Sequence, residues 1–383
     1  MKAMADTQTS DGLIPDIGPE NTVFTYGYRD DSDWGNAVST LAWQLYETYG
    51  DLKLLRDNYS MMQSYVAYLS NKTTTYIINN SGLGDWITFG NRTPKNYTAT
   101  FGYDQAVDAM VNVAAILGKH EDALYYTTLR TNISNAWNAN FFYASNSSYG
   151  PTQADNALAI QMKLVRPSVH VAVAGNILRD IAANGDHLTV GEIALPALFV
   201  ALQSVDRNDL IHRIVTNPTS PSYAYQVLNG ATSLNERWNG QTAGASLNHF
   251  MLGYVDKWIM EISGMKQSKG SIAWASVDFS PVFVGNLTYA ASRYRSARGL
   301  IAAHWRLSDS QMAYNITVPV GSVGIVSIKG YENVSEGGVD MSGKICRKGF
   351  SMCAAMVLIT PSPLGPGHTY STHAEGKCTI IRS

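Results

Sequence analysis

The residues of this chain that could do chemistry gather around one glutamate. Glu236 stands directly before Arg237 and Trp238, at the end of a turn-rich run that begins at Gly230. A carboxylate can transfer a proton, and an indole ring can stack on the C–H face of a sugar. The simpler alternative is a surface ion pair between Glu236 and Arg237, which would contribute little to stability. We interpret the run as a site for carbohydrate chemistry.

Three other loops combine aromatic rings with an acid or a histidine. They contain Asp33-Trp34-Gly35, Asp85-Trp86 after a Gly-Leu-Gly turn, and Asn248-His249-Phe250. By type alone, both tryptophans would be core residues and both aspartates helix N-caps. A histidine in a helical pattern is more often structural than catalytic. Glu192, which follows Thr-Val-Gly, could cap a helix or line a cavity.

Composition favours a neutral partner. The 383 residues are 45% hydrophobic, which is ample for a core, and only 15% charged with a net charge of -2. No basic field is therefore expected to attract nucleic acid or an anionic membrane. Eight Trp and 22 Tyr suit the binding of sugar faces. The sequence has no His-Glu-x-x-His, P-loop or Gly-x-Ser-x-Gly motif, so we expect no metal, no cofactor and no serine nucleophile.

The signals for location point to secretion. The chain has no apolar run of membrane-spanning length, and its first 20 residues lack the apolar segment of a signal peptide. Ten asparagines stand in the Asn-x-Ser/Thr pattern, which predicts a secreted, glycosylated eukaryotic protein. They are Asn58, Asn71, Asn79, Asn91, Asn96, Asn132, Asn146, Asn286, Asn315 and Asn333. The three cysteines, Cys346, Cys353 and Cys378, allow at most one disulfide.

Apolar spacing from about residue 36 to 264 predicts helices in pairs. One stripe runs through Val38, Leu41, Ala42, Leu45 and Tyr46, and the next through Leu55, Tyr59, Met62, Val66 and Leu69. Further pairs are expected at 101–118 with 121–138, at 153–165 with 168–184, and at 192–204 with 207–216. A last helix is expected at 246–264, with Leu247, Met251, Tyr254 and Trp258 facing inward.

Helical hairpins of this kind build either an open solenoid or a closed α/α toroid. Trp34, Trp86, Glu236 and His249 all lie just before predicted helices, so a toroid would gather them on one rim. A solenoid would leave them far apart. The pattern thus favours a mainly α toroid over residues 1–264.

Period-two alternation replaces the helical pattern after Gly264. Residues 265–271 are predicted to be a linker, and Met312, Tyr314, Ile316 and Val318 alternate as in a half-buried strand. We therefore expect an antiparallel β-sandwich over residues 265–383. The last 40 residues give no clear strand pattern.

Seven motifs in register make the chain resemble the α-L-rhamnosidases of the six-hairpin glycosidase class, glycoside hydrolase family 78. They begin at Asp33 (DWGNA with WQLYETYGD), Ser81 (SGLGDW), Tyr97 (YTAT), Leu188 (LTVGE), Tyr223 (YAYQV), Gly230 (GATSLNERW) and Leu247 (LNHFMLG). They cover about residues 10 to 264, and residues 267 to about 335 look like the C-terminal sandwich of that family.

The resemblance implies an inverting hydrolase that removes terminal α-L-rhamnose from rhamnosides. Glu236 matches the general base of the family, Trp34 and Trp86 its aromatic walls, and His249 a histidine that binds a sugar hydroxyl. Their neighbours Asp85, Arg237 and Trp238 are predicted to contact the substrate as well. Inversion needs an acid and a base about 6.5–9.5 Å apart, on opposite faces of the sugar.

One family motif has no match here. The general acid normally lies in a Cys-Pro-x-Arg-Glu-x-x-Gly-Trp motif upstream of the segment with which this sequence begins. We therefore expect an incomplete (α/α)6 toroid that lacks its N-terminal part, with Asp85 the only nearby carboxylate to weigh as a replacement acid. The alternative function is a rhamnose-binding or structural remnant without turnover, and a third is a six-hairpin hydrolase of another sugar.

Overall fold

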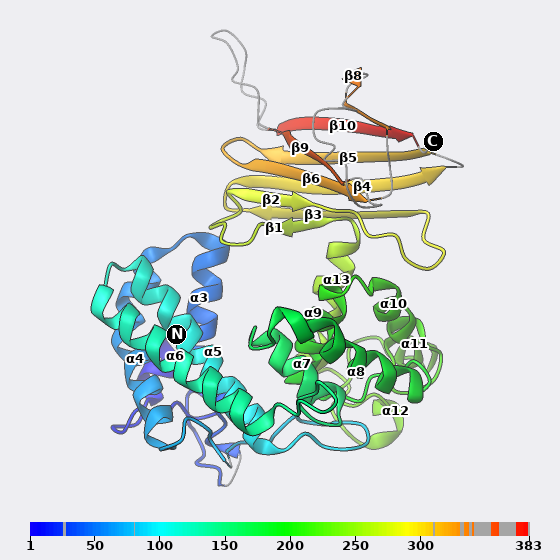
Figure 1. The fold of residues 1–383 in the computed structure, drawn as a ribbon. Coiled ribbons are helices and arrows are strands. Elements are labelled where there is room, and N and C mark those ends of the chain that lie inside the picture. Colours follow the sequence, from blue (N-terminus) through cyan, green and yellow to red (C-terminus); the bar gives the residue numbers. More distant parts are fainter. Residues whose placement is uncertain are drawn as a thin grey trace. The chain divides into compact units, whose positions relative to one another are not determined.

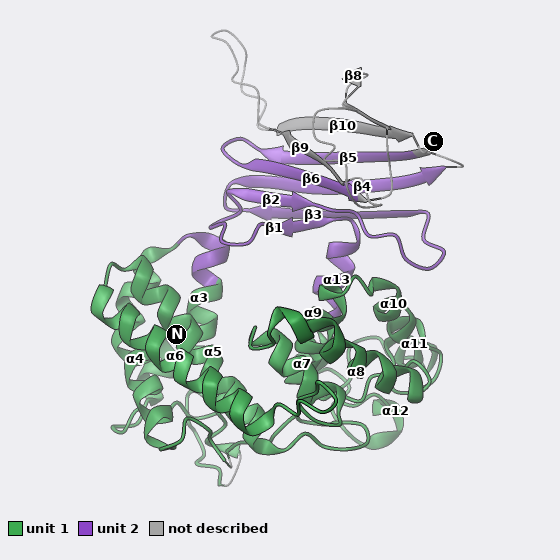
Figure 2. Ribbon diagram, viewed as in Figure 1, with its two compact units in different colours: residues 1–44, 51–254 green, residues 45–50, 255–383 purple. Residues whose placement is uncertain are grey.

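The computed structural model describes residues 1–25, 28–79, 81–308, 311–329, 333–336, 339–340, 354–359 and 373–381 (Figure 1). They form two compact units, coloured separately in Figure 2. The first unit consists of residues 1–44 and 51–254, and the second of residues 45–50 and 255–383. In the described part of the chain, no helix is both long enough and apolar enough to cross a membrane.

Helices dominate the first unit, and α3 continues into the second. The helices are α1 (Lys2–Thr7), α2 (Ser32–Gly35), α3 (Ala37–Tyr49), α4 (Leu52–Asn71), α5 (Lys95–Ile116), α6 (His120–Phe141), α7 (Gln153–Gln161), α8 (His170–Ala183), α9 (Ala194–Ser204), α10 (Asn208–Thr216), α11 (Tyr223–Leu228) and α12 (Gly240–Ala243), with 3-10 turns η2 (Pro167–Val169) and η3 (Phe250–Leu252).

The predicted series of paired helices is confirmed. Among the paired helices, α5 differs most from its predicted bounds. It begins at Lys95, directly after Pro94, and was predicted to begin at 101 because the polar residues of its first turn carry no apolar pattern. The lone helix predicted at 246–264 is wrong in extent. Residues 250–252 form η3 instead, and the helix α13 covers only Val255–Ile262. Leu247, expected to face inward, is 48% exposed.

The α5–α6 pair shows how the first unit is layered. Helix α5 is buried on all sides through its first turns, with every residue from Tyr97 to Asp104 buried. Helix α6 buries one stripe at helical spacing, which runs from Tyr126 through Ile133 to Phe141. A helix buried all round next to an amphipathic one is the pattern of an inner and an outer helix.

A buried ion pair ties three helices of this unit together. The guanidinium of Arg130 on α6 donates to Asp104 on α5 at 3.1 and 3.2 Å, and also bonds Asp108. It donates in addition to the carbonyl of Met162, the residue that ends α7, at 3.2 Å. Burial raises the pKa of Asp104 to about 6, although the charge of Arg130 opposes that rise.

The second unit is built from two sheets. The strands are β1 (Met265–Gln267), β2 (Ser276–Phe279), β3 (Tyr289–Ser296), β4 (Gly299–Ser308), β5 (Gln311–Pro319), β6 (Val323–Lys329), β7 (Asn333–Glu336), β8 (Val339–Asp340), β9 (Ala354–Ile359) and β10 (His373–Ile381). One sheet has the order β1-β2-β6-β9 and the other β3-β4-β5-β10-β7-β8.

Two predictions for this region need correction. The sheets are not purely antiparallel, because β2 and β6 pair in parallel. Residues 265–267 form β1 and are not a linker. Helix α13 is grouped with the second unit, and the indole of Trp305 donates to the carbonyl of Ile262 at 2.9 Å. The predicted strand at 312–318 is confirmed as β5. Cys346 and Cys353 lie outside the described residues.

Replacing Arg130 with methionine should lower the free energy of unfolding by about 3–5 kcal/mol, because it removes the cation that donates hydrogen bonds to the buried carboxylate of Asp104. Urea denaturation measures the change. The matched control is Lys53→Met, which breaks an exposed ion pair with Asp57 on α4 and should change stability little. Equal losses in the two variants would contradict the role given to the buried pair.

Candidate active site

The carboxylate of Asp85 binds the N-terminus of α9. Its Oδ1 accepts hydrogen bonds from the backbone N–H groups of Ile193 and Ala194, both at 3.0 Å, and its Oδ2 accepts one from Gly191 at 2.8 Å. Burial raises the pKa of Asp85, these three bonds lower it, and the net result is a pKa of about 6. Asp85 thus caps a helix more than 100 residues away along the chain.

The same contact sets the positions of Trp86 and Glu192. The N–H of Glu192 donates to the carbonyl of Trp86 at 3.0 Å, and that of Phe89 to the carbonyl of Thr189 at 3.0 Å. A Cβ on Gly191 would lie 2.2 Å from the oxygen of Trp86, so only glycine permits this approach. The indole of Trp86 meets the ring of Tyr28 edge-on, with 6.1 Å between centroids.

Trp34 lies on the short helix α2, and its side chain is 38% exposed. The N-cap of α2 is Asp31 rather than Asp33, because its Oδ1 accepts from the N–H of Asp33 at 2.9 Å. The Oδ2 of Asp31 accepts from the N–H of Leu83 at 2.7 Å. A Cβ at Gly82 would lie only 2.1 Å from that oxygen, and its φ is +72°. Asp31 therefore joins the loop of Trp34 to the loop of Trp86.

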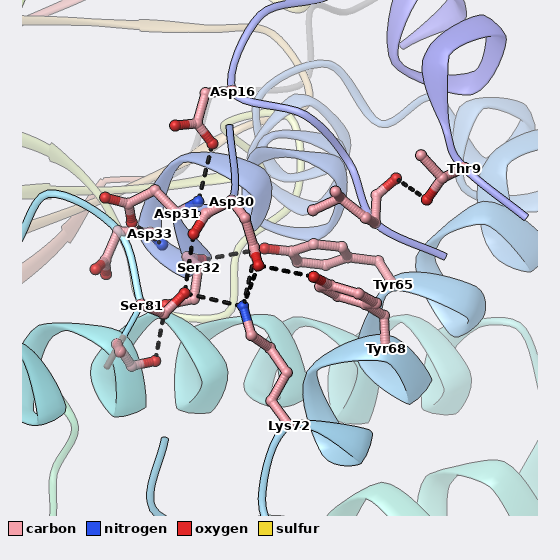
Figure 3. Close-up of polar contacts among 12 residues, drawn as sticks. Thr9, Asp16, Asp30, Asp31, Ser32, Asp33, Tyr65, Tyr68, Lys72 and Ser81 are labelled. Carbon is pink, nitrogen blue, oxygen red and sulfur yellow. Dashed lines mark hydrogen bonds and ion pairs between the residues drawn. The ribbon is translucent and has the colours of Figure 1, made fainter. Parts of the chain in front are cut away.

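A polar network around Asp30 supports these two loops (Figure 3). The ammonium group of Lys72, at the end of α4, bonds both carboxylate oxygens of Asp30 at 2.6 and 2.7 Å and the hydroxyl of Ser81 at 2.9 Å. Tyr68 donates to Asp30 at 2.8 Å, and Ser81 donates to its carbonyl at 2.9 Å. Asp16 accepts from the N–H of Asp31 at 2.9 Å.

Glu236 and His249 lie on two paired segments. The N–H of Glu236 donates to the carbonyl of Ser246 at 2.9 Å, and the N–H of Ser246 donates to Oε2 of Glu236 at 3.1 Å. The N–H of His249 donates to the carbonyl of Leu234 at 2.8 Å. The Nδ1 of His249 accepts from the N–H of Met251 at 3.1 Å, so in the neutral ring the proton is on Nε2.

Electrostatics links Glu192 to three other loops. Burial and, to a lesser extent, the carboxylates of Asp85, Asp31 and Glu236 together raise the pKa of Glu192 to about 7. Burial also raises the pKa of Asp33 well above its ordinary value, with added contributions from Asp31, Asp85 and Glu192. Among the described residues, neither Oδ1 of Asp33 nor Oε2 of Glu192 has a hydrogen-bond partner. Glu192 is therefore close enough to Asp31, Asp85 and Glu236 to be repelled by the carboxylates of three other loops.

Two of the predicted substrate contacts, Asp85 and Trp238, make contacts inside the fold. Asp85 is 7% exposed, and both of its oxygens already accept backbone hydrogen bonds. Trp238 is only 4% exposed and packs edge-on against Tyr223, with 4.8 Å between centroids. These contacts give both residues a structural role, and a contact with substrate stays a prediction for them. Arg237 is exposed, and a contact with substrate stays a prediction for it.

The sequence analysis did not identify Asp31 as the N-cap of α2. It considered Asp33 only as a helix cap and did not predict the raised pKa of this residue. Both lie in a run of four residues, Asp30 to Asp33, that contains three aspartates, and such a run just before a tryptophan was the available signal. The described residues include no group of three or more His, Cys, Asp or Glu side chains placed to hold a metal ion.

The fold and this arrangement of loops define a six-hairpin glycosidase. Residues 1–262 match the bacterial alpha-L-rhamnosidase 6 hairpin glycosidase domain, and residues 264–342 match the bacterial alpha-L-rhamnosidase C-terminal domain. The chain belongs to this α-L-rhamnosidase family.

Solved and curated relatives agree with this assignment. The structure of an α-L-rhamnosidase from Dictyoglumus thermophilum is 27% identical, with a TM-score of 0.87, and the match covers 100% of this chain and 43% of that one. The structure of the Streptomyces avermitilis α-L-rhamnosidase complexed with L-rhamnose is 25% identical, with a TM-score of 0.85. This match covers 99% of this chain and 36% of that one. Curated α-L-rhamnosidases of Streptomyces avermitilis and an Alteromonas species are 29% and 28% identical over 82% and 83% of this chain. The match spans only 31% and 36% of those two relatives.

The raised pKa of Glu192 predicts a pH-dependent stability. In the unfolded chain the carboxyl group of Glu192 has its ordinary pKa of 4.5, whereas in the folded state its pKa is about 7. The folded state binds more protons in this window, so stability falls as the pH rises through it. Glu192→Gln removes this loss, and the variant should gain stability relative to the parent between about pH 5 and about pH 8.

Urea denaturation of parent and variant at about pH 5 and at about pH 8 measures this gain. Glu121→Gln, an exposed substitution on α6, serves as the control and should show no such change. A difference between parent and Glu192→Gln that is the same at both pH values would show that Glu192 does not retain its proton on folding.

Proposed function

We propose that the helical unit forms a rhamnose subsite of an inverting α-L-rhamnosidase, with Glu236 as the general base. The observation that carries this proposal is the pairing of the segments 234–236 and 246–249, which joins Glu236 and His249 through hydrogen bonds between their two loops. The relative from Streptomyces avermitilis that was solved with L-rhamnose supports rhamnose as the sugar.

The environment of Glu236 suits a base. The N–H of Ser246 holds Oε2, and among the described residues Oε1 has no hydrogen-bond partner and is left to accept a proton from water. The side chain is partly exposed, so water can reach it. In an inverting reaction this water attacks the anomeric carbon from the face opposite the leaving oxygen, while an acid protonates that oxygen.

The other predicted residues would hold the sugar. The exposed indole of Trp34 and the partly buried indole of Trp86 offer faces for the C–H bonds and the methyl group of rhamnose. His249 has its Nε2–H available as a donor to a sugar hydroxyl, because its Nδ1 is occupied by the N–H of Met251. A pocket for a deoxy-sugar needs few such polar groups.

A second candidate is rhamnose binding without turnover. It is favoured by the state of Asp85, the carboxylate weighed as a replacement acid, because three backbone N–H groups occupy its oxygens. A proton donor held in this way cannot turn toward a leaving oxygen.

The test is the hydrolysis of p-nitrophenyl α-L-rhamnoside. We expect Glu236→Gln to lower the rate of the chain about 10²- to 10⁴-fold, because it removes the group that accepts the proton of water. Glu121→Gln should leave the rate unchanged, and NMR of the parent reaction should show β-L-rhamnose as the first product.

The outcomes separate the alternatives. Turnover that survives Glu236→Gln would exclude Glu236 as the base. No turnover by the parent, together with quenching of tryptophan fluorescence by rhamnose, would favour the binding function. If another sugar binds while rhamnose does not, the assignment to rhamnose fails.

A further inference from the structure

A pocket of about 290 Å³ lies in the first unit, between the C-terminal end of α4 and the helices α5 and α6. It shares no residue with the loops of Trp34, Trp86, Glu236 and His249. Its volume is near the lower end of the range of small-molecule sites, roughly 300–1,000 Å³. None of its nine lining residues, all in the described part of the chain, carries a charge.

The floor of this pocket is a buried tyrosine. Tyr103 on α5 is 1% exposed, and its hydroxyl shares a hydrogen bond of 2.8 Å with that of Ser70 on α4. Burial raises the pKa of Tyr103 to about 12, so its hydroxyl stays neutral. Two neutral hydroxyls thus meet at the base of the pocket.

Two exposed tyrosines form its walls. Tyr125 on α6 is 57% exposed, and Tyr76, in the segment after α4, is 39% exposed. Tyr76 has a φ of +64°, a region that bulky side chains rarely adopt, and its hydroxyl accepts a hydrogen bond from the amide of Asn132 at 3.3 Å. Both rings are therefore accessible. The hydrogen bond from Asn132 also joins Tyr76 to α6, the helix that carries Tyr125.

The rim offers hydrogen-bond acceptors without charge. The hydroxyl of Thr128 donates its proton to the carbonyl of Leu124 at 2.9 Å, so its lone pairs remain for a ligand. The amide oxygen of Asn132 is an acceptor of the same kind. Aromatic faces combined with neutral hydroxyl and amide groups suit a ligand with C–H faces and many hydroxyls.

We propose that this pocket binds a neutral saccharide unit of one or two rings, as an accessory site separate from the loops of Glu236. The absence of charged residues among its lining disfavours an anion or a cation, because nothing there would replace the hydration of a charge. The many hydroxyl groups disfavour a purely apolar ligand. The proposal does not depend on the rhamnosidase activity, and either can fail alone.

The experiment follows the tyrosines of the pocket directly. The chain is labelled with 3-fluorotyrosine, and the ¹⁹F resonances of Tyr76 and Tyr125 are those that vanish in Tyr76→Phe and Tyr125→Phe. D-Glucose, L-rhamnose and cellobiose are the neutral saccharide probes, and D-glucuronate and toluene are the charged and apolar probes. We expect a saturable shift of both resonances with at least one neutral saccharide and none with the other two.

Two matched pairs of variants test the contacts. Thr128→Val should weaken saccharide binding about fivefold, because it removes one acceptor. Thr127→Val should not, since Thr127 makes the same kind of bond to a carbonyl, at 2.7 Å, but does not line the pocket. Tyr125→Ala should weaken binding about tenfold through lost stacking, whereas Leu124→Ala, its exposed neighbour, should have no effect.

The proposal is overturned if no neutral saccharide shifts the two resonances, or if toluene alone shifts them. It is also overturned if the variants within each matched pair bind the saccharide equally well. A shift that persists in Glu236→Gln with the parent affinity would support a site independent of the proposed catalytic loops.

Discussion

The bond between Asp85 and the N-terminus of α9 is the contact on which the candidate site depends. A carboxylate at a helix N-terminus meets unpaired N–H groups and the positive end of the helix dipole. Because these N–H groups belong to residues 191–194, the bond fixes Glu192 and Trp86 at once. Its removal would leave three buried donors unsatisfied, which makes this position structural even though it lies among residues with chemical roles.

Crowding of acids follows from that arrangement. Asp31, Asp33, Asp85 and Glu192 come together because Asp31 and Asp85 are both needed as acceptors for backbone N–H groups. Glu192 and Asp33 then sit beside charges that they cannot balance, and burial together with repulsion raises the pKa of both. Sites that bind or transform a ligand tolerate such strain more often than the rest of a fold.

The helices and the family could be predicted from the sequence, whereas the pairing of loops could not. Apolar spacing placed α3 to α10 because each buries a stripe or a whole face in the core. Asp85 was weighed as a cap or an acid, but no local pattern shows that it caps α9, which is distant along the chain. The same limit applies to Trp238, because a tryptophan beside a glutamate looks the same whether its ring is open or packed on Tyr223.

The two sites proposed for the first unit differ in charge for a physical reason. Proton transfer requires groups that change their protonation state, and next to Glu236 burial and neighbouring charges raise the pKa of Glu192. Binding alone does not require such groups, and the pocket between α4, α5 and α6 has neutral tyrosine, threonine and asparagine side chains. We propose a neutral sugar as the ligand of both sites, and of the two it is the loops around Glu236 that have a carboxylate suited to activate water.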